Sequence, residues 1–231
     1  IDVPRFPAQP ALTAPVDTTV VGKEAPMLFM GWRADASKSL QLDTLEVIAQ
    51  LLSNGQAGLF DLDLSQKLKV QEVSAGIADM DEYSVFYVYG QPKSGQTLQE
   101  VRSLALSEIE KLKKGNFSDD LLPSIVNNYK RYYYTQLDNN QFRAKQYVDA
   151  FINHKDWKQE VDKLNRISKL TKAEIVKFAN QFFRNDFACV YKEQGNDTTI
   201  KKVEKPTITP IPTNNDKQSD FLKEIVNTKT T

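Results

Sequence analysis

The stretch YSVFYVYGQPKSGQTLQEVRSLALSEIEKLKKG, from Tyr83 to Gly115, contains two different periodicities in a short piece of chain. Its first part alternates, so that the odd-numbered positions from Tyr83 to Tyr89 share one face of a strand and the even-numbered positions share the other. Both faces are largely apolar or aromatic, which predicts a strand that is central in its sheet and covered on one side. Thr97 and Glu100 then form a capping box ahead of apolar residues at helical spacing, and Gly115 ends that helix.

The same two patterns recur on both sides of this stretch. Apolar runs predict further strands at residues 25–32, 73–77 and 187–191. Helical spacing and capping residues predict helices at 42–52, 59–68, from 118 onward, and at 140–152, 157–164, 171–182 and 221–225. The fold class is therefore α+β, with a mostly antiparallel sheet and helices packed on one of its faces.

Most of the prolines lie near the two ends of the chain. Residues 1–19 show no periodicity and contain prolines at positions 4, 7, 10 and 15, which predicts an entering linker. Residues 20–195 hold the strand signals and nearly all of the helix signals, and we expect them to form one domain. Residues 196–231 are polar and interrupted by proline, and they are expected to be an interdomain linker and tail.

The bulk composition excludes several classes of function. Thirty Lys and Arg balance thirty Asp and Glu among 231 residues, so no net charge would attract nucleic acid or an anionic membrane. No apolar run approaches the ~18 residues that a membrane-spanning helix needs. The single cysteine, Cys189, excludes a disulfide within the chain, and we expect it to be a small buried residue rather than a reactive thiol.

The chain offers few residues for catalysis or metal binding. A zinc peptidase site on a helix requires two histidines one turn apart and a glutamate, whereas the one histidine here is His154. We therefore predict no catalytic residue and no metal ligand, and interpret His154 as a residue at a helix C-terminus. The carboxylate pairs Asp61/Asp63 and Asp119/Asp120 are expected to be solvated, the second pair beside a helix dipole.

Two further segments have structural interpretations. Asn54–Gly58 contains two glycines but none of the residues that complete a phosphate-binding loop, which favours a turn between helices. Arg131 precedes three consecutive tyrosines, which on a helix would point in three directions, some into the core and some to the surface. A neutral chain disfavours nucleobase stacking by these rings, whereas a peptide-binding chamber or a contact between domains are both compatible with them.

Four segments carry a resemblance to a known family. They are a helix with its glycine-containing turn, the entry into the sheet, the joint between two helices, and the last helix before the closing strand (residues 51–60, 64–76, 108–121 and 170–183). In order and spacing they resemble one homology domain of the pitrilysin/insulinase family of zinc metallopeptidases. The resemblance covers about residues 20–195.

The resemblance implies that this chain is one member of a pair of domains. Family members pair a domain that carries His-x-x-Glu-His and zinc with a domain that carries no metal. This chain lacks the motif, so the resemblance implies a catalytically silent companion domain with no cofactor of its own. The zinc is then expected in the other domain of the pair. The implied partners are that zinc-bearing domain of the same protein and peptide substrates. The implied place is the second of four domains, joined by its tail to the second half.

The resemblance does not identify the residues that contact peptide. Non-zinc domains of the family supply an arginine and a tyrosine that hold substrate, but the corresponding stretch, residues 84–98, has tyrosines and no arginine. We therefore name no substrate-binding residue. A scaffold or assembly module, as in relatives that have lost proteolysis, is the alternative function. An unrelated small-molecule enzyme would need convergent polar groups, and no such set is evident. A periplasmic location is suggested by family analogy alone.

Overall fold

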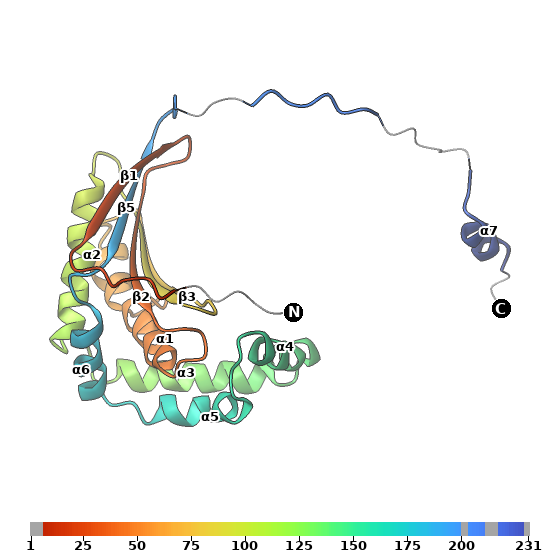
Figure 1. The fold of residues 1–231 in the computed structure, drawn as a ribbon. Helices are drawn as coiled ribbons and strands as arrows, with labels where there is room; N and C mark the ends of the chain where they lie inside the picture. The colour runs from red at the N-terminus through yellow and green to blue at the C-terminus, as the bar shows by residue number, and fades with distance from the viewer. Residues whose placement is uncertain (1–6, 200–202, 211–216, 229–231) are drawn as a thin grey trace. The chain divides into compact units, whose positions relative to one another are not determined.

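A five-stranded sheet forms the centre of the structure (Figure 1). The computed structural model describes residues 7–199, 203–210 and 217–228. The strands lie in the order β1-β5-β2-β4-β3; the pair β1–β5 is parallel and the other three pairs are antiparallel. Their bounds are Val16–Gly22 (β1), Met27–Ala34 (β2), Glu72–Ala78 (β3), Ser84–Gln91 (β4) and Ala188–Gln194 (β5). The predicted α+β fold with a mostly antiparallel sheet is confirmed.

Strand β4 has the central position that its sequence predicts, between β2 and β3. Phe86 and Val88 on its even-numbered face are fully buried, whereas the tyrosines on its odd-numbered face are half-buried. Strand β2 follows the same rule, with Leu28 and Met30 fully buried and Phe29 exposed. The apolar run at residues 25–32 is therefore buried on one side only, because the sheet is covered by helices on that side.

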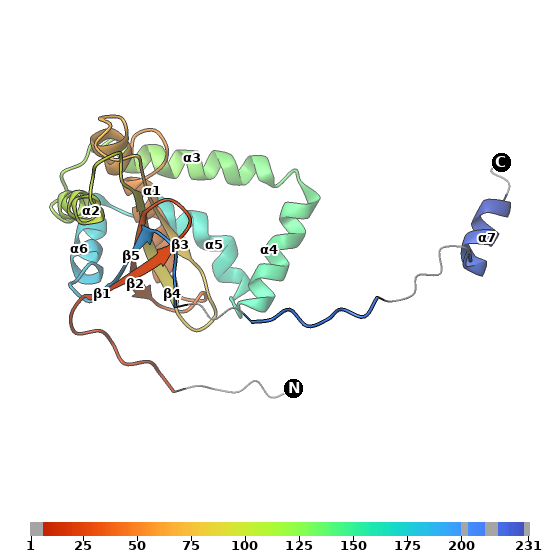
Figure 2. The same ribbon diagram turned by 90° about the horizontal axis from the view of Figure 1, so that it is seen from above.

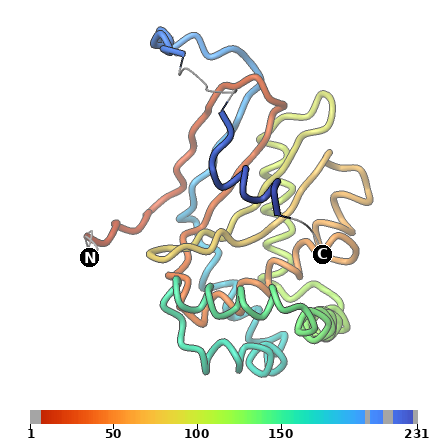
Figure 3. The backbone as a smooth tube through the Cα atoms, turned by 90° about the vertical axis from the view of Figure 1, so that its right-hand side faces the viewer, coloured from red at the N-terminus to blue at the C-terminus, as the bar shows by residue number. Residues whose placement is uncertain are grey.

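The helices gather on one face and at one end of the sheet (Figures 1 and 2). Helices α1, α2 and α6 contact the strands or one another, while α3, α4 and α5 lie together at one end of the domain (Figure 3). The bounds are Gln41–Leu52 (α1), Leu98–Lys113 (α2), Leu121–Gln136 (α3), Asn140–Ile152 (α4), Trp157–Ser168 (α5) and Lys172–Phe182 (α6), with a π-helical turn, η1, at Asp61–Ser65. No described helix is both long and apolar enough to cross a membrane.

Both capping boxes predicted from the sequence are present. The Thr97 hydroxyl accepts from the backbone N–H of Glu100, whose carboxylate accepts from the Thr97 N–H, and α2 begins there. Thr171 and Glu174 repeat the arrangement at α6. Such reciprocal bonds satisfy backbone donors that a helix leaves unpaired at its start. Helix α3 begins later than predicted from Ser118. The Ser118 hydroxyl accepts from the Asp120 N–H, and the helix begins at Leu121.

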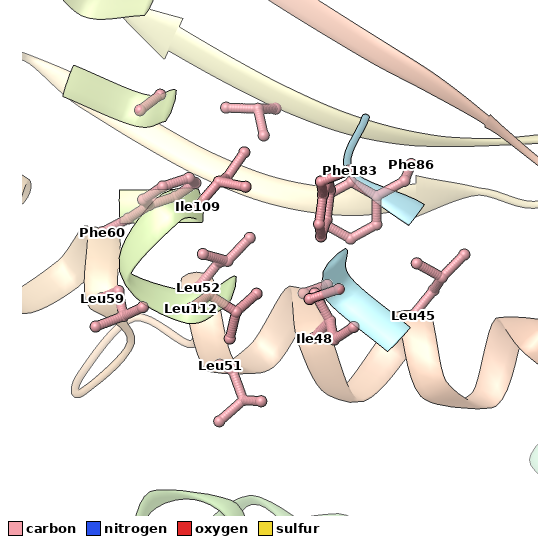
Figure 4. Packing of buried hydrophobic residues seen from close by; sticks show 14 of the residues in the cluster. Leu45, Ile48, Leu51, Leu52, Leu59, Phe60, Phe86, Ile109, Leu112 and Phe183 are labelled. Carbon is pink, nitrogen blue, oxygen red and sulfur yellow. The ribbon is translucent and has the colours of Figure 1, made fainter. Parts of the chain in front are cut away.

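Helix α1 is the centre of the core (Figure 4). Leu45 and Ile48 are fully buried and lie toward the aromatic rings of Phe86 and Phe183, while Leu52 lies near Leu112 of α2. Burial of each such side chain contributes roughly 1.5–3 kcal/mol to folding. The core therefore lies on the helix-covered side of the sheet, and the opposite side is left to other roles.

One strand was not predicted. Residues 16–19, assigned from the sequence to an entering linker, begin strand β1, which pairs in parallel with β5 from Val16↔Ala188 to Gly22↔Gln194. The partner strand lies about 170 positions further along the chain, so no local pattern reveals the pairing. An edge strand with most of its residues exposed also lacks the alternation that identified the inner strands.

The contacts divide the chain into two compact units, Ile1–Asp197 and Thr198–Thr231. In the second unit, residues 203–210 are neither helix nor strand, and α7 spans Asp220–Asn227. Ser219 caps α7 through the N–H of Leu222, and none of the helix's residues is buried. The short terminal helix predicted around residues 221–225 is confirmed. The domain boundaries at residues 20 and 196 stay predictions, the first of which falls inside β1.

Candidate functional site

The side chains best suited to bind zinc lie on separate elements. His154 lies two residues after the end of α4, is exposed, and has a left-handed backbone with φ of 51°. Cys189 lies inside β5, fully buried as expected, and burial raises the pKa of its thiol. Within the described residues, no three His, Cys, Asp or Glu side chains lie close enough to hold a metal ion. The His, Cys, Asp and Glu side chains that the structure describes therefore do not fit a resident zinc ion.

The surface opposite the helices is an aromatic sheet face. We call it the open face; it is formed by six odd-numbered residues of β2 and β4 (Phe29, Gly31, Arg33, Val85, Tyr87 and Tyr89). The rings of Phe29 and Tyr87 stack with centroids 5.4 Å apart, and Phe29 is 39% exposed. Tyr87 lies over Gly76 of β3, where a Cβ atom would come within 2.6 Å of the tyrosine oxygen. Glycine at this position thus allows the ring to lie flat across the sheet.

A cavity of about 710 Å³ opens at one end of the open face. Its walls come from the ends of β2, β4 and β5, from α6, and from the segment Gln9–Leu12 that precedes β1. Apolar and aromatic side chains dominate the walls, among them Phe29, Val85, Phe182 and Val190. Ligand sites in proteins are commonly apolar cavities of this size with a few polar groups.

Arg33 is one of two arginines that line this cavity, and the other is Arg184. Its Nη1 donates to the main-chain oxygen of Gln9 at 3.0 Å and to that of Pro10 at 3.3 Å. The guanidinium carbon lies 4.9 Å from the centre of the Tyr83 ring, which supports the planar cation from one side. Arg33 was not singled out from the sequence. One signal in the sequence could have identified it: a lone charged residue in the apolar run of β2, at an odd-numbered position that belongs to the open face.

A second set of contacts fixes the loop before β5, which also lines the cavity. The indole Nε1 of Trp32 donates to the main-chain oxygen of Arg184 at 3.2 Å. The Arg184 side chain pairs in turn with Asp186 at 2.7 Å. These bonds tie the loop before β5 to β2, so the cavity wall is positioned by the core side of the sheet.

A polar network joins α1 to α3 and α5. The Tyr129 hydroxyl donates to Glu46 at 2.6 Å, and Lys163 donates to the same carboxylate at 2.8 Å. Arg166 pairs with Asp43, one helical turn before Glu46, at 2.7 Å. Burial raises the pKa of Tyr129, whereas for Lys163 burial is outweighed by the Glu46 carboxylate, so that its pKa is also raised. Tyr129 is thus neutral and Lys163 charged at neutral pH, which suits a structural junction.

The prediction that Asp61 and Asp63 are solvated is wrong for Asp61. Asp61 is only 7% exposed, and its Oδ2 accepts from the backbone N–H groups of Asn54, Gln56 and Gly58. It therefore holds the turn between α1 and η1 that the sequence did predict. Asp63 is partly exposed, and hydrogen bonds from Lys111 and then Lys67 hold its pKa well below the usual range. Both residues support the structure.

The expectation that part of the tyrosine run enters the core is also wrong. Tyr132 and Tyr134 are 59% and 62% exposed, and Tyr133 is half-buried. Phe142 of α4 contacts Tyr132 and Tyr133 edge-on, which gives an aromatic cluster outside the core. The tyrosine that does pack inward is Tyr129, one turn earlier on α3, because that position faces α1 and α5.

Helix α4 continues this exposed aromatic surface. Of its thirteen residues only Ala150 is buried. Four of its large side chains are instead exposed: Phe151 by 82%, Tyr147 by 60%, Ile152 by 57% and Val148 by 56%. We call these four residues the α4 patch. Large exposed apolar patches on soluble domains usually mark interaction surfaces.

Solved structures with the same arrangement of sheet and helices are known. A protease from Helicobacter pylori superposes with a TM-score of 0.76 at 18% identity, covering 84% of this chain and 48% of that one. A peptidase M16 inactive domain from Pseudomonas fluorescens gives 0.68 at 11% identity, covering 82% and 46%. The first half of the periplasmic protease PqqL from Escherichia coli gives 0.65 at 10% identity, covering 83% and 44%. This chain thus spans about half the length of these structures.

These likenesses define the fold as that of peptidase M16-type domains, with one helix-covered and one open sheet face. The family described as the peptidase M16 inactive domain matches residues 1–129, more than half of the 231 residues. The chain belongs to that family, which confirms the resemblance to pitrilysin and insulinase domains. The search of curated proteins found no match to this chain.

Proposed function

We propose that this chain is the catalytically silent companion domain of a zinc metalloendopeptidase. Its open face forms part of the wall of a peptide-binding chamber, and its α4 patch contacts and supports the zinc-bearing domain of the same protein. The observation that carries the proposal is the aromatic open face with the cavity at its end, in a member of an inactive peptidase-domain family. The protein names attached to similar structures, a protease and a periplasmic protease, agree with such a parent.

The sheet offers two kinds of contact to an extended peptide. Stacked rings such as Phe29 and Tyr87 present an apolar surface that suits side chains of many sequences. The sheet order places β1 and β3 at its edges, where unpaired backbone groups suit strand addition. A chamber wall that holds unfolded peptide without a strict sequence requirement fits both features.

The α4 patch suits a stable contact with a folded partner. A helix of thirteen residues that buries only Ala150 gains little from tertiary packing, although short helices depend on it. Aromatic side chains are enriched in the centres of protein interfaces. Covering the patch by the zinc-bearing domain would supply the missing packing and would hold the two domains in register.

The companion role predicts activation of the zinc-bearing partner. Alone, the chain should hold no stoichiometric zinc and cleave no peptide; added to the zinc-bearing domain, it should raise the hydrolysis of an unfolded fluorogenic peptide. Phe151→Glu should abolish most of this gain, because a charge would be buried at the interface. The matched control, Lys158→Glu, changes an exposed residue of α5 outside the patch.

Two results would contradict the companion role. One tight zinc ion in the isolated chain, with turnover to match, would remove its premise of catalytic silence. An unchanged peptidase rate across a wide range of added chain would instead favour the scaffold function, in which the α4 patch assembles the protein and the open face has no peptide to contact.

A further inference from the structure

The cavity at the end of the open face already has a segment of chain lying against it. Residues Gln9–Leu12 form one wall, are exposed along their length, and belong to neither helix nor strand. The hydrogen bonds that fix this segment to β2 come from Arg33 rather than from the sheet backbone. The contact is therefore made to main-chain carbonyl groups, which every peptide carries.

The sequence of the segment indicates its conformation. Prolines stand at positions 7 and 10, and three residues make one turn of a polyproline II helix. That helix has no internal hydrogen bonds, so its carbonyl groups stay available to an outside donor. Aromatic grooves that bind proline-rich peptides exploit this preformed, extended shape. Here the aromatic contribution comes from Phe29, Trp32 and Tyr83.

The arginine is well prepared to receive such a ligand. Tyr83 supports the guanidinium plane at 4.9 Å, and Nη1 reaches two successive carbonyl oxygens, those of Gln9 and Pro10. A lysine would offer a point charge without the planar, ring-stacked arrangement. The neighbouring apolar walls provide room for a side chain beside the bound carbonyls, as Leu12 shows by lining the same cavity.

We propose that this cavity is a binding site for an extended, proline-containing peptide, in which Arg33 holds two successive main-chain carbonyls. In this structure the segment Gln9–Leu12 holds the Arg33 hydrogen bonds, and a peptide of the same class displaces it from them. The inference rests on the proposed function in taking peptide as the ligand, and it adds the site, the class of peptide and the residue that binds it.

The test uses Trp32, which lines the cavity, as a reporter. The chain has two tryptophans, so Trp157→Phe leaves Trp32 as the only one. The probe is an acetylated and amidated peptide with the sequence of residues 5–13, RFPAQPALT. We expect a saturable change in Trp32 fluorescence in the full chain. The same peptide with glycine at both proline positions should bind several-fold more weakly, because it is less pre-organised.

Substitutions identify the role of the arginine and of the resident segment. Because Arg33 also holds the competing segment, its role is measured in the Pro10→Gly derivative, where that segment competes less well. There Arg33→Ala should weaken binding about tenfold or more, and Arg33→Lys by a smaller factor. Arg131→Ala removes an exposed guanidinium from α3 and should leave the affinity unchanged. Pro10→Gly should tighten binding of the added peptide about threefold, because a more flexible resident segment competes less well.

Three results would overturn the site. The first is no saturable change up to millimolar peptide in either the Trp157→Phe chain or its Pro10→Gly derivative. The second is equal binding by the Pro10→Gly derivative with and without Arg33→Ala, and the third is an equal loss in Arg131→Ala. If Arg33→Ala fails to fold, the ratio of the dissociation constants of Arg33→Lys and its parent decides instead. Because the zinc-bearing domain is absent from these titrations, their failure leaves the activation test of the companion role intact, and the reverse also holds.

Discussion

A single carboxylate organises the turn between α1 and η1. Asp61 Oδ2 accepts from three backbone N–H groups at 2.9 to 3.2 Å, and the turn includes Gly55 in the left-handed region with φ of 80°. Three donors converge on one oxygen because Asn54 bends the chain back through its own side-chain bonds to Gln56 and Ala57. A charged acceptor at such a point compensates for the helical bonds that the turn lacks.

We predict that Asp61→Ala lowers the free energy of unfolding by about 2–3 kcal/mol, because it leaves buried backbone donors without an acceptor. Asp61→Asn keeps one acceptor oxygen and should lose less. The measurement is urea-induced unfolding followed by circular dichroism. Asp81→Ala, on the exposed turn before β4, is the control and should change the value by less than about 0.5 kcal/mol. A similar small effect for Asp61→Ala would show that the turn does not depend on the carboxylate.

Glu108 on α2 is an acid in an unfavourable place. Its side chain is 2% exposed; Oε1 accepts from Lys111 at 2.9 Å, and Oε2 is buried with no hydrogen-bond partner among the described residues. Burial raises the pKa of Glu108 above its ordinary 4.5, although Lys111 works in the opposite direction. The nearby Asp63 carboxylate also opposes its ionisation.

This arrangement predicts a particular dependence on pH. The folded protein binds the Glu108 proton more tightly than the unfolded chain does, so the resulting stability is present below pH 4.5 and is lost as pH rises through the folded pKa. Glu108→Gln should therefore gain stability relative to the parent as pH rises from 4.5 to 7, measured by urea unfolding at each pH. The exposed control Glu82→Gln should follow the parent. A constant difference at all pH values would contradict the buried-acid interpretation.

At the scale of elements, helices of similar length differ sharply in how much they bury. Helix α1 buries seven of its twelve residues, whereas α4 buries one of thirteen. Local opening free energies follow such differences in packing. Helix α4 is thus regular and is capped by Asn139, but its stability depends on a partner that covers its exposed side.

We predict that amides of α4 exchange with deuterium orders of magnitude faster than those of α1 in the isolated chain. Adding the zinc-bearing domain should slow exchange in α4 and leave α1 unchanged. Hydrogen exchange read by mass spectrometry measures both. Protection of α4 equal to that of α1 without a partner would show that the helix is stable by itself, and the α4 patch would lose its main support as a docking surface.

The elements also show what a sequence reveals. Alternation in β4, the capping boxes at Thr97 and Thr171 and the turn at Asn54–Gly58 are local signals, and each was predicted because the residues that decide it are neighbours. Strand β1 was missed because its partner β5 is distant in sequence. Arg33 and Tyr129 were missed for the same reason, since each gains its role from elements that only the fold brings together.

In the candidate site, the absence of a two-histidine zinc site was evident from composition, and the open face was implied by the two apolar faces of β4. The cavity was not predictable. It requires the segment before β1, the ends of three strands and α6 to meet, and no single stretch of sequence encodes such a meeting.

At the scale of the whole molecule, stability and contact surfaces are separated. The buried core lies between the sheet and α1, α2 and α6, while the open face and the α4 patch contribute little to it. Substitutions on the exposed surfaces should therefore alter partner or peptide binding with little loss of folding, which makes the functional tests interpretable. The division at Asp197 extends this separation along the chain.

We predict that a chain ending at Asp197 unfolds with the same midpoint and the same urea dependence as the full chain, because α7 buries none of its residues. The urea dependence scales with the surface that unfolding exposes, so an unchanged slope would mean that the tail adds no buried surface to the domain. A chain ending at Asp186 is the matched control. It lacks β5, which joins β1 to β2 and supplies the buried Cys189 and Tyr191, and it should lose cooperative unfolding. In the chain that ends at Asp197, a shallower urea dependence or a loss of more than about 1 kcal/mol in the free energy of unfolding would move the domain boundary beyond residue 196.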